Sequence, residues 1–135
     1  MDMMESINIS AGGMFAQSQR MKVAAQNIAN ANSMQAANGT GPYRAKQVQF
    51  NTVLNRATGA STVQARVTED RVTPFNTIYN PGSDMADANG FVQMPNVNST
   101  LENINMREAQ RSYEANLAAI TTAREMATRT LDMLR

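Results

Sequence analysis

The chain has 135 residues, which favours one domain, and its 12 Lys and Arg against 11 Asp and Glu leave a net charge of only +1. So small a charge, with no basic run and no tryptophan, argues against nucleic acid or an anionic membrane surface as a partner. Cysteine and histidine are both absent, which excludes disulfides, thiolate metal sites and cysteine catalysis and removes the commonest general base.

Large apolar residues are scarce. Leu, Ile, Val and Phe supply only 23 of the 135 residues, few for a self-sufficient core, while alanine, asparagine and methionine contribute 20, 15 and 11. We therefore expect part of the surface to be buried against other chains, the alternative being a modest monomer packed on alanine. No apolar run reaches the roughly 18 residues of a transmembrane helix, and the opening MDMMESINIS lacks the features of a cleaved signal peptide.

The spacing of apolar residues predicts a long helix over residues 3–32. Each glycine of the pair Gly12-Gly13 costs about 1 kcal/mol relative to alanine inside a helix, so this helix needs a packing partner. A 3-4 heptad pattern is typical of a coiled-coil seam, and a core helix of a small bundle is the alternative. The seam residues are Ile7, Met14, Met21 and Ile28, with the small residues Ala11, Ser18 and Ala25 between them.

The helix ends in the asparagine-dense stretch NIANANSM at 27–34. Asparagine is a mediocre helix former, but its amide can bond to the backbone carbonyls that a helix end leaves free. We expect Asn27, Asn30 and Asn32 to form a polar joint there and to contact a neighbouring chain. A frayed helix end with solvated amides is the alternative.

Residues 34–97 differ from the flanks, since this segment holds all four prolines. β-like composition predicts short strands, and Pro74 restricts one of them to a sheet edge or an irregular segment. The segment is therefore predicted to be a small, loop-rich β insertion. Its predicted strands span residues 43–50, 62–68, 72–79 and 91–94.

Residues 99–135 predict a second long helix, roughly 50 Å in length, because no Gly or Pro interrupts them. Ser99 followed by Glu102 matches a capping box. Apolar residues again recur every seven positions. They are Met106, Tyr113, Ile120, Ala127 and Leu134, with Leu117 and Leu131 beside them.

Together these elements predict a mainly α fold in which residues 1–33 and 98–135 form one discontinuous domain, an antiparallel coiled coil, with the 34–97 insertion at one end. Only one face of each helix is then covered within the chain, which leaves apolar surface for neighbours. The predicted helix and subunit interface comprises Ile7, Met14, Met21, Ile28, Tyr113, Leu117, Ile120, Leu131 and Leu134.

Motifs that would indicate catalysis or ligand binding are missing. The stretch Asp84–Gly90 resembles a calcium loop, but the first and last acidic ligands of that pattern are replaced by Met85 and Asn96. A turn stabilised by Asx side chains is the better interpretation. We expect no enzymatic activity, no cofactor, no metal site and no small-molecule substrate.

Three blocks of the chain carry a family resemblance. They are RMKVAAQNIANANS at 20–33, GPYRAKQVQF at 41–50 and YNPGSDMADANGFVQMPNVNSTLENINMREAQRSYEANL at 79–117. The sequence resembles the bacterial flagellar rod and hook proteins, and within them the proximal rod subunits of the basal body. Departures are mild, with Ser33 where threonine is common and Asn80 where an acid is frequent.

The resemblance implies a structural subunit exported unfolded by the flagellar type III apparatus, without signal cleavage. Such subunits form a hollow helical rod that crosses the periplasm, transmits torque and conducts later subunits. The implied partners are copies of the chain, other rod proteins and the membrane-embedded base. Residues of the insertion, especially 79–97, are expected to contact adjacent subunits and to help set rod straightness. The candidates are Tyr43, Tyr79, Phe91, Met94 and Pro95.

Two other classes of function remain open at this point. One is a soluble helical adaptor or an accessory protein of the export apparatus, and the other is a carboxylate-based enzyme or lytic factor. Heptads at both extreme ends favour the rod subunit over the adaptor, because nothing is left over to form a separate ligand site. The enzyme would need a clustered acidic pocket.

Overall fold

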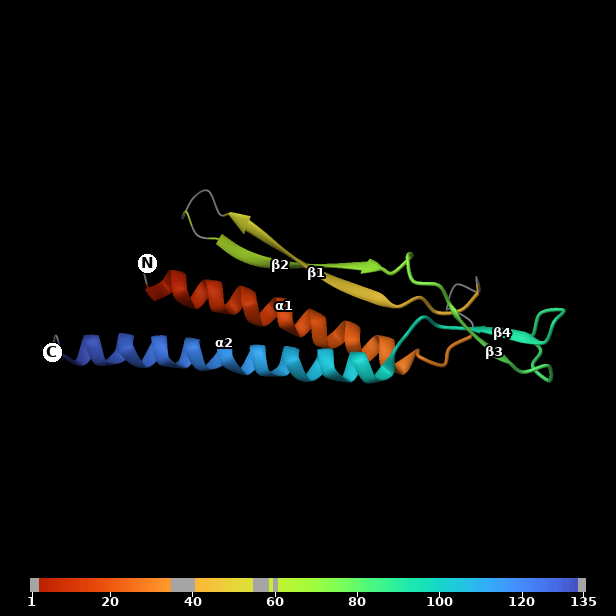
Figure 1. The fold of residues 1–135 in the computed structure, drawn as a ribbon. Coiled ribbons are helices and arrows are strands. Elements are labelled where there is room, and N and C mark those ends of the chain that lie inside the picture. Colours follow the sequence, from red (N-terminus) through yellow and green to blue (C-terminus); the bar gives the residue numbers. More distant parts are fainter. Residues whose placement is uncertain (1–2, 35–40, 55–58, 60, 134–135) are drawn as a thin grey trace.

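Two long helices dominate the computed structural model, which describes residues 3–34, 41–54, 59 and 61–133. Helix α1 spans Met3–Ala29 and helix α2 spans Ser99–Met133, so both predicted helices are confirmed. The helices lie side by side and antiparallel, with the two chain ends at the same end of the molecule (Figure 1). At 1.5 Å per residue α2 is about 52 Å long and α1 about 40 Å, and α2 extends past the start of α1 (Figure 1).

The line along which the helices meet is rich in small and polar residues. Ala109 of α2 is completely buried and lies seven residues from both Glu102 and Asn116, while Gly13 of α1 lies opposite Asn116, so the two backbones approach closely. The contacts recur about every seven residues, as an antiparallel pair of helices requires. They join Gly13 to Asn116, Arg20 to Glu108, and Asn27 to Glu102.

A β-hairpin lies along α1 and packs on that helix rather than on α2 (Figure 1). Strand β1 (Lys46–Leu54) pairs antiparallel with β2 (Ser61–Glu69), in a register that runs from Lys46↔Glu69 to Leu54↔Ser61. The expectation that the whole insertion sits at one end of the helices is therefore wrong. The hairpin approaches the helix at Gly12, where a Cβ would lie 3.8 Å from both Thr62 Cβ and the Val63 carbonyl oxygen, an ordinary van der Waals distance.

A second two-stranded sheet projects beyond the helices at the end opposite the termini (Figure 1). Strand β3 (Asn76–Tyr79) pairs antiparallel with β4 (Phe91–Met94), which starts and ends where the sequence predicts. Strand β3 begins only two residues after Pro74, which cannot donate to a strand ladder, so it is shorter than the predicted segment 72–79.

The start of α2 differs from the prediction in one detail. Asn98, rather than Ser99, is the capping residue, because its Oδ1 accepts hydrogen bonds from the backbone N–H groups of Thr100 at 3.1 Å and Leu101 at 3.2 Å. Glu102 therefore does not act in the predicted capping box. Its carboxylate instead accepts a hydrogen bond from Asn27 of α1.

The core is built from small side chains, as the composition suggests. The buried apolar residues are Ala16, Val23, Ala24, Ala45, Val92 and Ala109, together with Pro95.

None of the helices described is long and apolar enough to cross a membrane.

Candidate functional site

Asn27, near the C-terminal end of α1, is completely buried, with an exposed fraction of 0%. An asparagine amide has two N–H donors and two acceptor positions on its oxygen, and all four are used here. Nδ2 donates to the Lys46 carbonyl at 2.8 Å and to Glu102 Oε1 at 3.1 Å. Oδ1 accepts from the Lys46 N–H and from the Tyr43 hydroxyl, both at 2.9 Å.

These bonds tie three segments together at one point. The amide pairs with both backbone groups of Lys46, the first residue of β1, much as a neighbouring strand would. The bond to Glu102 reaches the first turn of α2. A buried polar network in which every group is paired specifies one arrangement of its elements, so Asn27 sets where the hairpin and α2 meet α1.

Tyr43 contributes a titratable group to this cluster. Burial raises the pKa of its hydroxyl above the ordinary value of 10.0, and the nearby carboxylates of Glu102 and Glu69 raise it further. The protonated hydroxyl can donate to Asn27, whereas a phenolate could not. The cluster is therefore built for the neutral form of Tyr43.

The other two asparagines of the predicted joint take smaller roles. Asn30 Nδ2 donates to the Gln26 carbonyl at 2.8 Å, and Asn30 Oδ1 accepts from Ser33 Oγ at 3.2 Å. The Gln26 carbonyl also accepts from the Asn30 backbone N–H at 3.1 Å, so the Asn30 side chain reinforces the last turn of the helix, and the bond from Ser33 fixes the turn that follows it. Asn32 is exposed.

A second polar cluster joins the two ends of the insertion. Asn96 Oδ1 accepts from the Ala45 N–H at 2.8 Å, and its Nδ2 donates to the carbonyls of Thr73 at 3.2 Å and Asp70 at 3.3 Å. The Asp70 carboxylate accepts from the Thr73 hydroxyl at 2.6 Å. Hydrogen bonds from the Thr73 side chain and backbone, and from the Val72 N–H, hold the pKa of Asp70 below its ordinary value of 3.8.

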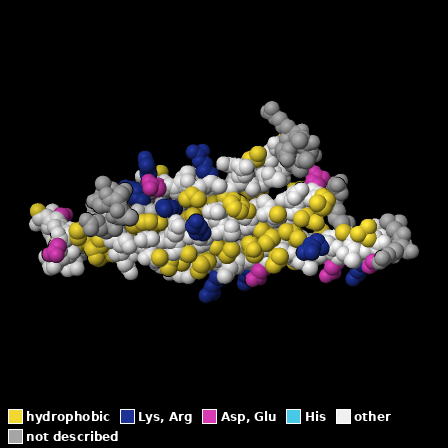
Figure 2. All heavy atoms as spheres, turned by 180° about the vertical axis from the view of Figure 1, so that it is seen from behind, with side chains coloured by type: hydrophobic (Ala, Val, Ile, Leu, Met, Phe, Trp, Pro, Cys, Tyr) yellow, Lys and Arg dark blue, Asp and Glu magenta, His cyan; other side chains and the backbone are white. Residues whose placement is uncertain are grey.

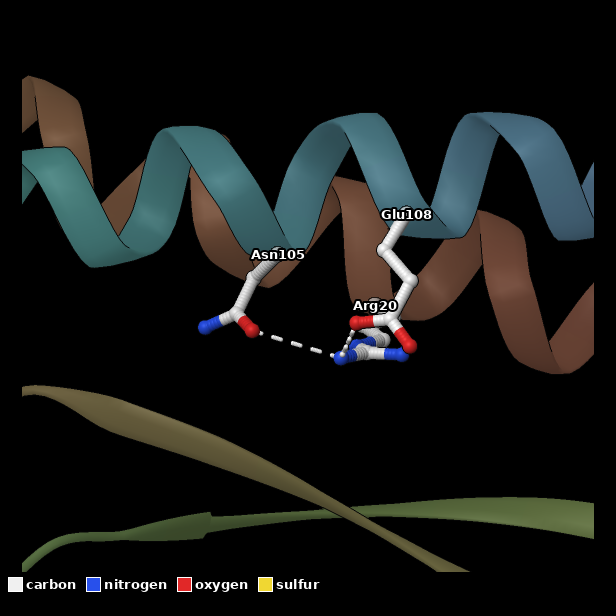
Figure 3. Close-up of polar contacts among 3 residues, drawn as sticks. All are labelled: Arg20, Asn105 and Glu108. Atoms are coloured by element: carbon white, nitrogen blue, oxygen red, sulfur yellow. Dashed lines mark hydrogen bonds and ion pairs between the residues drawn. The ribbon is translucent and has the colours of Figure 1, made fainter.

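An ion pair closes the middle of the helix interface. Arg20 Nη2 lies 2.9 Å from Glu108 Oε2 and donates to Asn105 Oδ1 at 3.3 Å. Figure 3 shows the three side chains meeting on the side of the helices that faces the hairpin. A groove of about 310 Å³ opens there between α1, β1 and the start of α2, and apolar side chains form part of its wall. Those side chains are Val23, Ala24, Val48 and Leu101.

The predicted interface residues on the helices are not buried within the chain. On α1, Ile7, Met14, Met21 and Ile28 are all half-buried, and the last three each follow directly after a residue that contacts α2. On α2, Tyr113 and Ile120 are half-buried, while Leu117 and Leu131 are exposed. Leu134 lies outside the described residues. The predicted set therefore leaves apolar surface available to other chains.

The predicted contact residues of the insertion fall into two groups. Pro95 is buried and Tyr43 bonds to Asn27, so both act inside the chain. Tyr79 and Phe91 are exposed, and their rings pack edge to face with centroids 5.4 Å apart. Met94 is half-buried.

Sequence reasoning missed Arg20, Glu102 and Asn96. Each is a polar residue whose partner lies far away in the sequence, so no local pattern marks it. A signal existed for Arg20, which stands seven residues after Gly13 and seven before Asn27. Among the residues described, no three His, Cys, Asp or Glu side chains gather to hold a metal ion.

Family models match both helical ends of the chain. A model described as flagella basal body rod protein matches residues 7–33, which include α1 from Ile7 onward and the asparagine-rich turn. A second model, described as flagellar basal body rod FlgEFG protein C-terminal, matches residues 88–133, which include β4 and α2. The matched segments thus contain Asn27 and Glu102, which bond to each other.

Curated relatives extend the similarity over the insertion as well. Flagellar basal-body rod protein FlgC of Salmonella typhimurium is 42% identical over 98% of both chains. FlgC of Escherichia coli O6:H1 is 41% identical over 98% of both chains, and FlgC of Aquifex aeolicus is 39% identical over 98% of this chain and 97% of its own. Identity at this level over the whole length shows that the chain belongs to the FlgC family of flagellar basal-body rod proteins and is a structural subunit of the rod.

Proposed function

We propose that this rod subunit assembles with copies of itself and with other rod proteins into a hollow helical shaft that crosses the periplasm. The shaft transmits torque and conducts exported subunits, and its base rests on the membrane-embedded part of the basal body. The chain reaches this place unfolded, through the flagellar type III export apparatus and without cleavage of a signal peptide.

The observation that carries the proposal is the exposed apolar surface on both helices of a chain whose relatives are rod proteins throughout their length. A subunit that buries mainly alanine inside itself gains further burial by packing against neighbours. Because different faces of one elongated subunit meet different neighbours, such contacts are heterologous and build an open filament rather than a closed dimer.

The two helices act as one unit in this proposal. Residues 1–33 and 98–135 form a discontinuous coiled-coil domain, and residues 34–97 are an insertion that reaches neighbouring subunits. The heptad contacts between α1 and α2 support this division. The surface that the half-buried and exposed seam residues, from Ile7 to Leu131, leave uncovered within the chain packs against other subunits.

Complementation in a motile bacterium that lacks its own FlgC gene tests the proposal. Basal bodies purified from cells expressing this chain should contain it, and swimming should be restored. Leu131→Ser should abolish both, because Leu131 is 68% exposed and its loss affects an assembly surface rather than the fold.

The matched control is Val72→Ser, which changes an apolar residue that is 94% exposed and lies outside the predicted interface. This variant should assemble and support swimming. Recovery of the wild-type chain only in the soluble fraction, with no trace in basal bodies, would contradict a rod role and favour a soluble adaptor.

A further inference from the structure

The end of the molecule opposite the termini carries a cluster of exposed apolar side chains. We name residues 76–94, the β3–β4 sheet and its connecting loop, the tip. Within the tip, Tyr79 is 68% exposed and Phe91 is 45% exposed. Met85 is exposed as well and lines a pocket together with Phe91, whereas exposed Ile78 lies on the opposite face of the sheet, where it pairs with Val92. Exposed aromatic and large aliphatic residues gathered at one place mark a protein contact.

Hydrogen bonds and close packing in the loop between β3 and β4 fix the position of the aromatic pair Tyr79 and Phe91. The Asp87 carboxylate accepts hydrogen bonds from the N–H groups of Asn89 and Phe91, both at 2.9 Å. Gly90 has a φ of +81°, and a Cβ at this position would lie only 2.9 Å from Tyr79 Cε2. A surface that is already fixed loses little conformational entropy on binding, so the tip is preorganised for a partner.

The charge of the tip restricts the partner. No Lys or Arg occurs between Arg71 and Arg107, whereas Asp84 and Asp87 are both exposed within the tip. Figure 2 shows acidic side chains beside apolar ones at this end of the molecule. The partner surface should therefore be apolar with a positive charge.

A surface of this kind lies on the other half of the same chain. A shallow groove of about 440 Å³ follows the C-terminal half of α2, towards the chain ends and away from the tip (Figure 1). Two arginines and one glutamate line it, which leaves one positive charge, and apolar side chains line the rest together with two threonines. The lining residues are Leu117, Ile120, Thr121, Arg124, Glu125, Thr128 and Arg129.

We propose that the tip of one copy docks in the α2 groove of a second copy. Tyr79 and Phe91 pack against Leu117 and Ile120, and Asp84 faces Arg124. Because the two surfaces differ and lie on opposite halves of the molecule, the contact leaves a free tip and a free groove on every pair and continues from copy to copy. This inference rests on the assembly of the chain with copies of itself, which is part of the proposed function.

The absence of cysteine makes crosslinking a direct test. The purified variant Asn80→Cys/Thr121→Cys, oxidised at high protein concentration, should give a ladder of disulfide-linked oligomers, because exposed Asn80 follows Tyr79 in the tip and its replacement leaves the aromatic pair intact. Asn80→Cys/Gln110→Cys is the matched control, since Gln110 is also exposed on α2 but lies outside the groove. No ladder, or an equal ladder from both variants, overturns the proposal.

A charge swap tests the chemistry of the contact. In the crosslinking variant, Asp84→Lys or Arg124→Asp should each lower the yield of oligomers roughly fivefold, as expected for a surface charge pair. The two changes in one chain should restore the yield, because every contact again joins opposite charges. Failure of the double change to restore it counts against the pairing of tip and groove.

Incorporation into basal bodies is the measurement that distinguishes this inference from the rod function on which it rests. Asp84→Lys should prevent the chain from being incorporated into them. Normal incorporation would show that the tip contact is wrong while the rod function stands. If incorporation fails but the purified chain forms no ladder, the occupant of the groove is another rod protein, and the proposal of a second copy is overturned.

Discussion

Gly12 and Gly13 are neighbours in α1, but they face different elements. Gly12 lies against β2, where an added Cβ would be 3.8 Å from Thr62 Cβ, whereas a Cβ on Gly13 would be 2.8 Å from Asn116 Nδ2 of α2. The pair therefore lets α1 pack closely on both sides at the same level. From the sequence alone, the glycine pair predicts only a weak point of the helix.

This difference predicts opposite outcomes for two alanine substitutions. Gly12→Ala should raise the free energy of unfolding by up to about 1 kcal/mol, because it improves helix propensity and its Cβ makes an ordinary contact. Gly13→Ala should give little or no gain, because the Asn116 side chain has to move. Urea denaturation of the purified chain measures both. Equal gains would contradict the close approach, and Gly13→Ala in an Asn116→Ala background should recover the full gain.

Removal of the buried amide should be costly. Asn27→Ala leaves the Lys46 backbone groups and the Tyr43 hydroxyl without their partner, so the free energy of unfolding should fall by at least about 2 kcal/mol. Asn27→Asp keeps both acceptor contacts but loses both donors and faces Glu102 with a second carboxylate. Asn27→Asp should therefore be more damaging at about pH 7 than at about pH 4, where the introduced aspartate can take up a proton.

The control for Asn27 is Asn32→Ala, which changes an exposed asparagine of the same turn. Its effect on the free energy of unfolding should stay within about 0.5 kcal/mol. A similar small effect of Asn27→Ala would mean that the amide does not organise the fold. Loss of swimming in Asn27→Ala alone, with Asn32→Ala normal, would place the joint inside the subunit rather than between subunits.

Stability at high pH should depend on Tyr43. Its pKa is raised in the folded chain, so the folded state holds the proton more tightly than the unfolded state. The stabilisation is therefore complete below the unfolded value of about 10 and is lost as the pH rises through the raised pKa. The difference in unfolding free energy between wild type and Tyr43→Phe should shrink between about pH 8 and about pH 11. A constant difference would contradict the role of the neutral hydroxyl.

Stability at low pH should depend on Asp70. Its pKa is lowered in the folded chain, chiefly by the hydrogen bonds from Thr73. The stabilisation is present above the ordinary value of 3.8 and is lost as the pH falls through the lowered pKa. Asp70→Asn should remove this acid-dependent part, and Thr73→Val should weaken it because the 2.6 Å bond is lost. Thermal unfolding at about pH 7 and about pH 3 compares the three chains.

The sequence predicts the elements better than their packing. Both helices and β4 follow from local periodicity and from the absence of Gly and Pro, which act over a few residues. The surface on which β1 and β2 pack could not be predicted, since it joins residues far apart in the sequence, such as Gly12 and Thr62. The heptads of apolar residues do not mark the contacts that Gly13, Arg20 and Asn27 make with α2, because these three residues are small or polar.

The polar joint was predicted in part. An asparagine-dense helix end suggested backbone hydrogen bonds, and Asn27 and Asn30 make them. The partner Glu102 could not be predicted, because it lies 75 residues away and was interpreted as a capping residue of its own helix. Exposed Asn32 has the same local context as Asn27, so only the fold distinguishes the two.

The bonds that join the helices also set the timing of folding. Asn27 and Glu102 are separated by 75 residues, and Arg20 and Glu108 by 88. Long-range contacts of this kind form only after the loop between them has closed. A chain that emerges from a narrow channel one end first therefore cannot complete its helix pair until most of its length is outside. If the chain is exported unfolded, as we propose, the position of Glu102 delays the folded state until export is nearly finished.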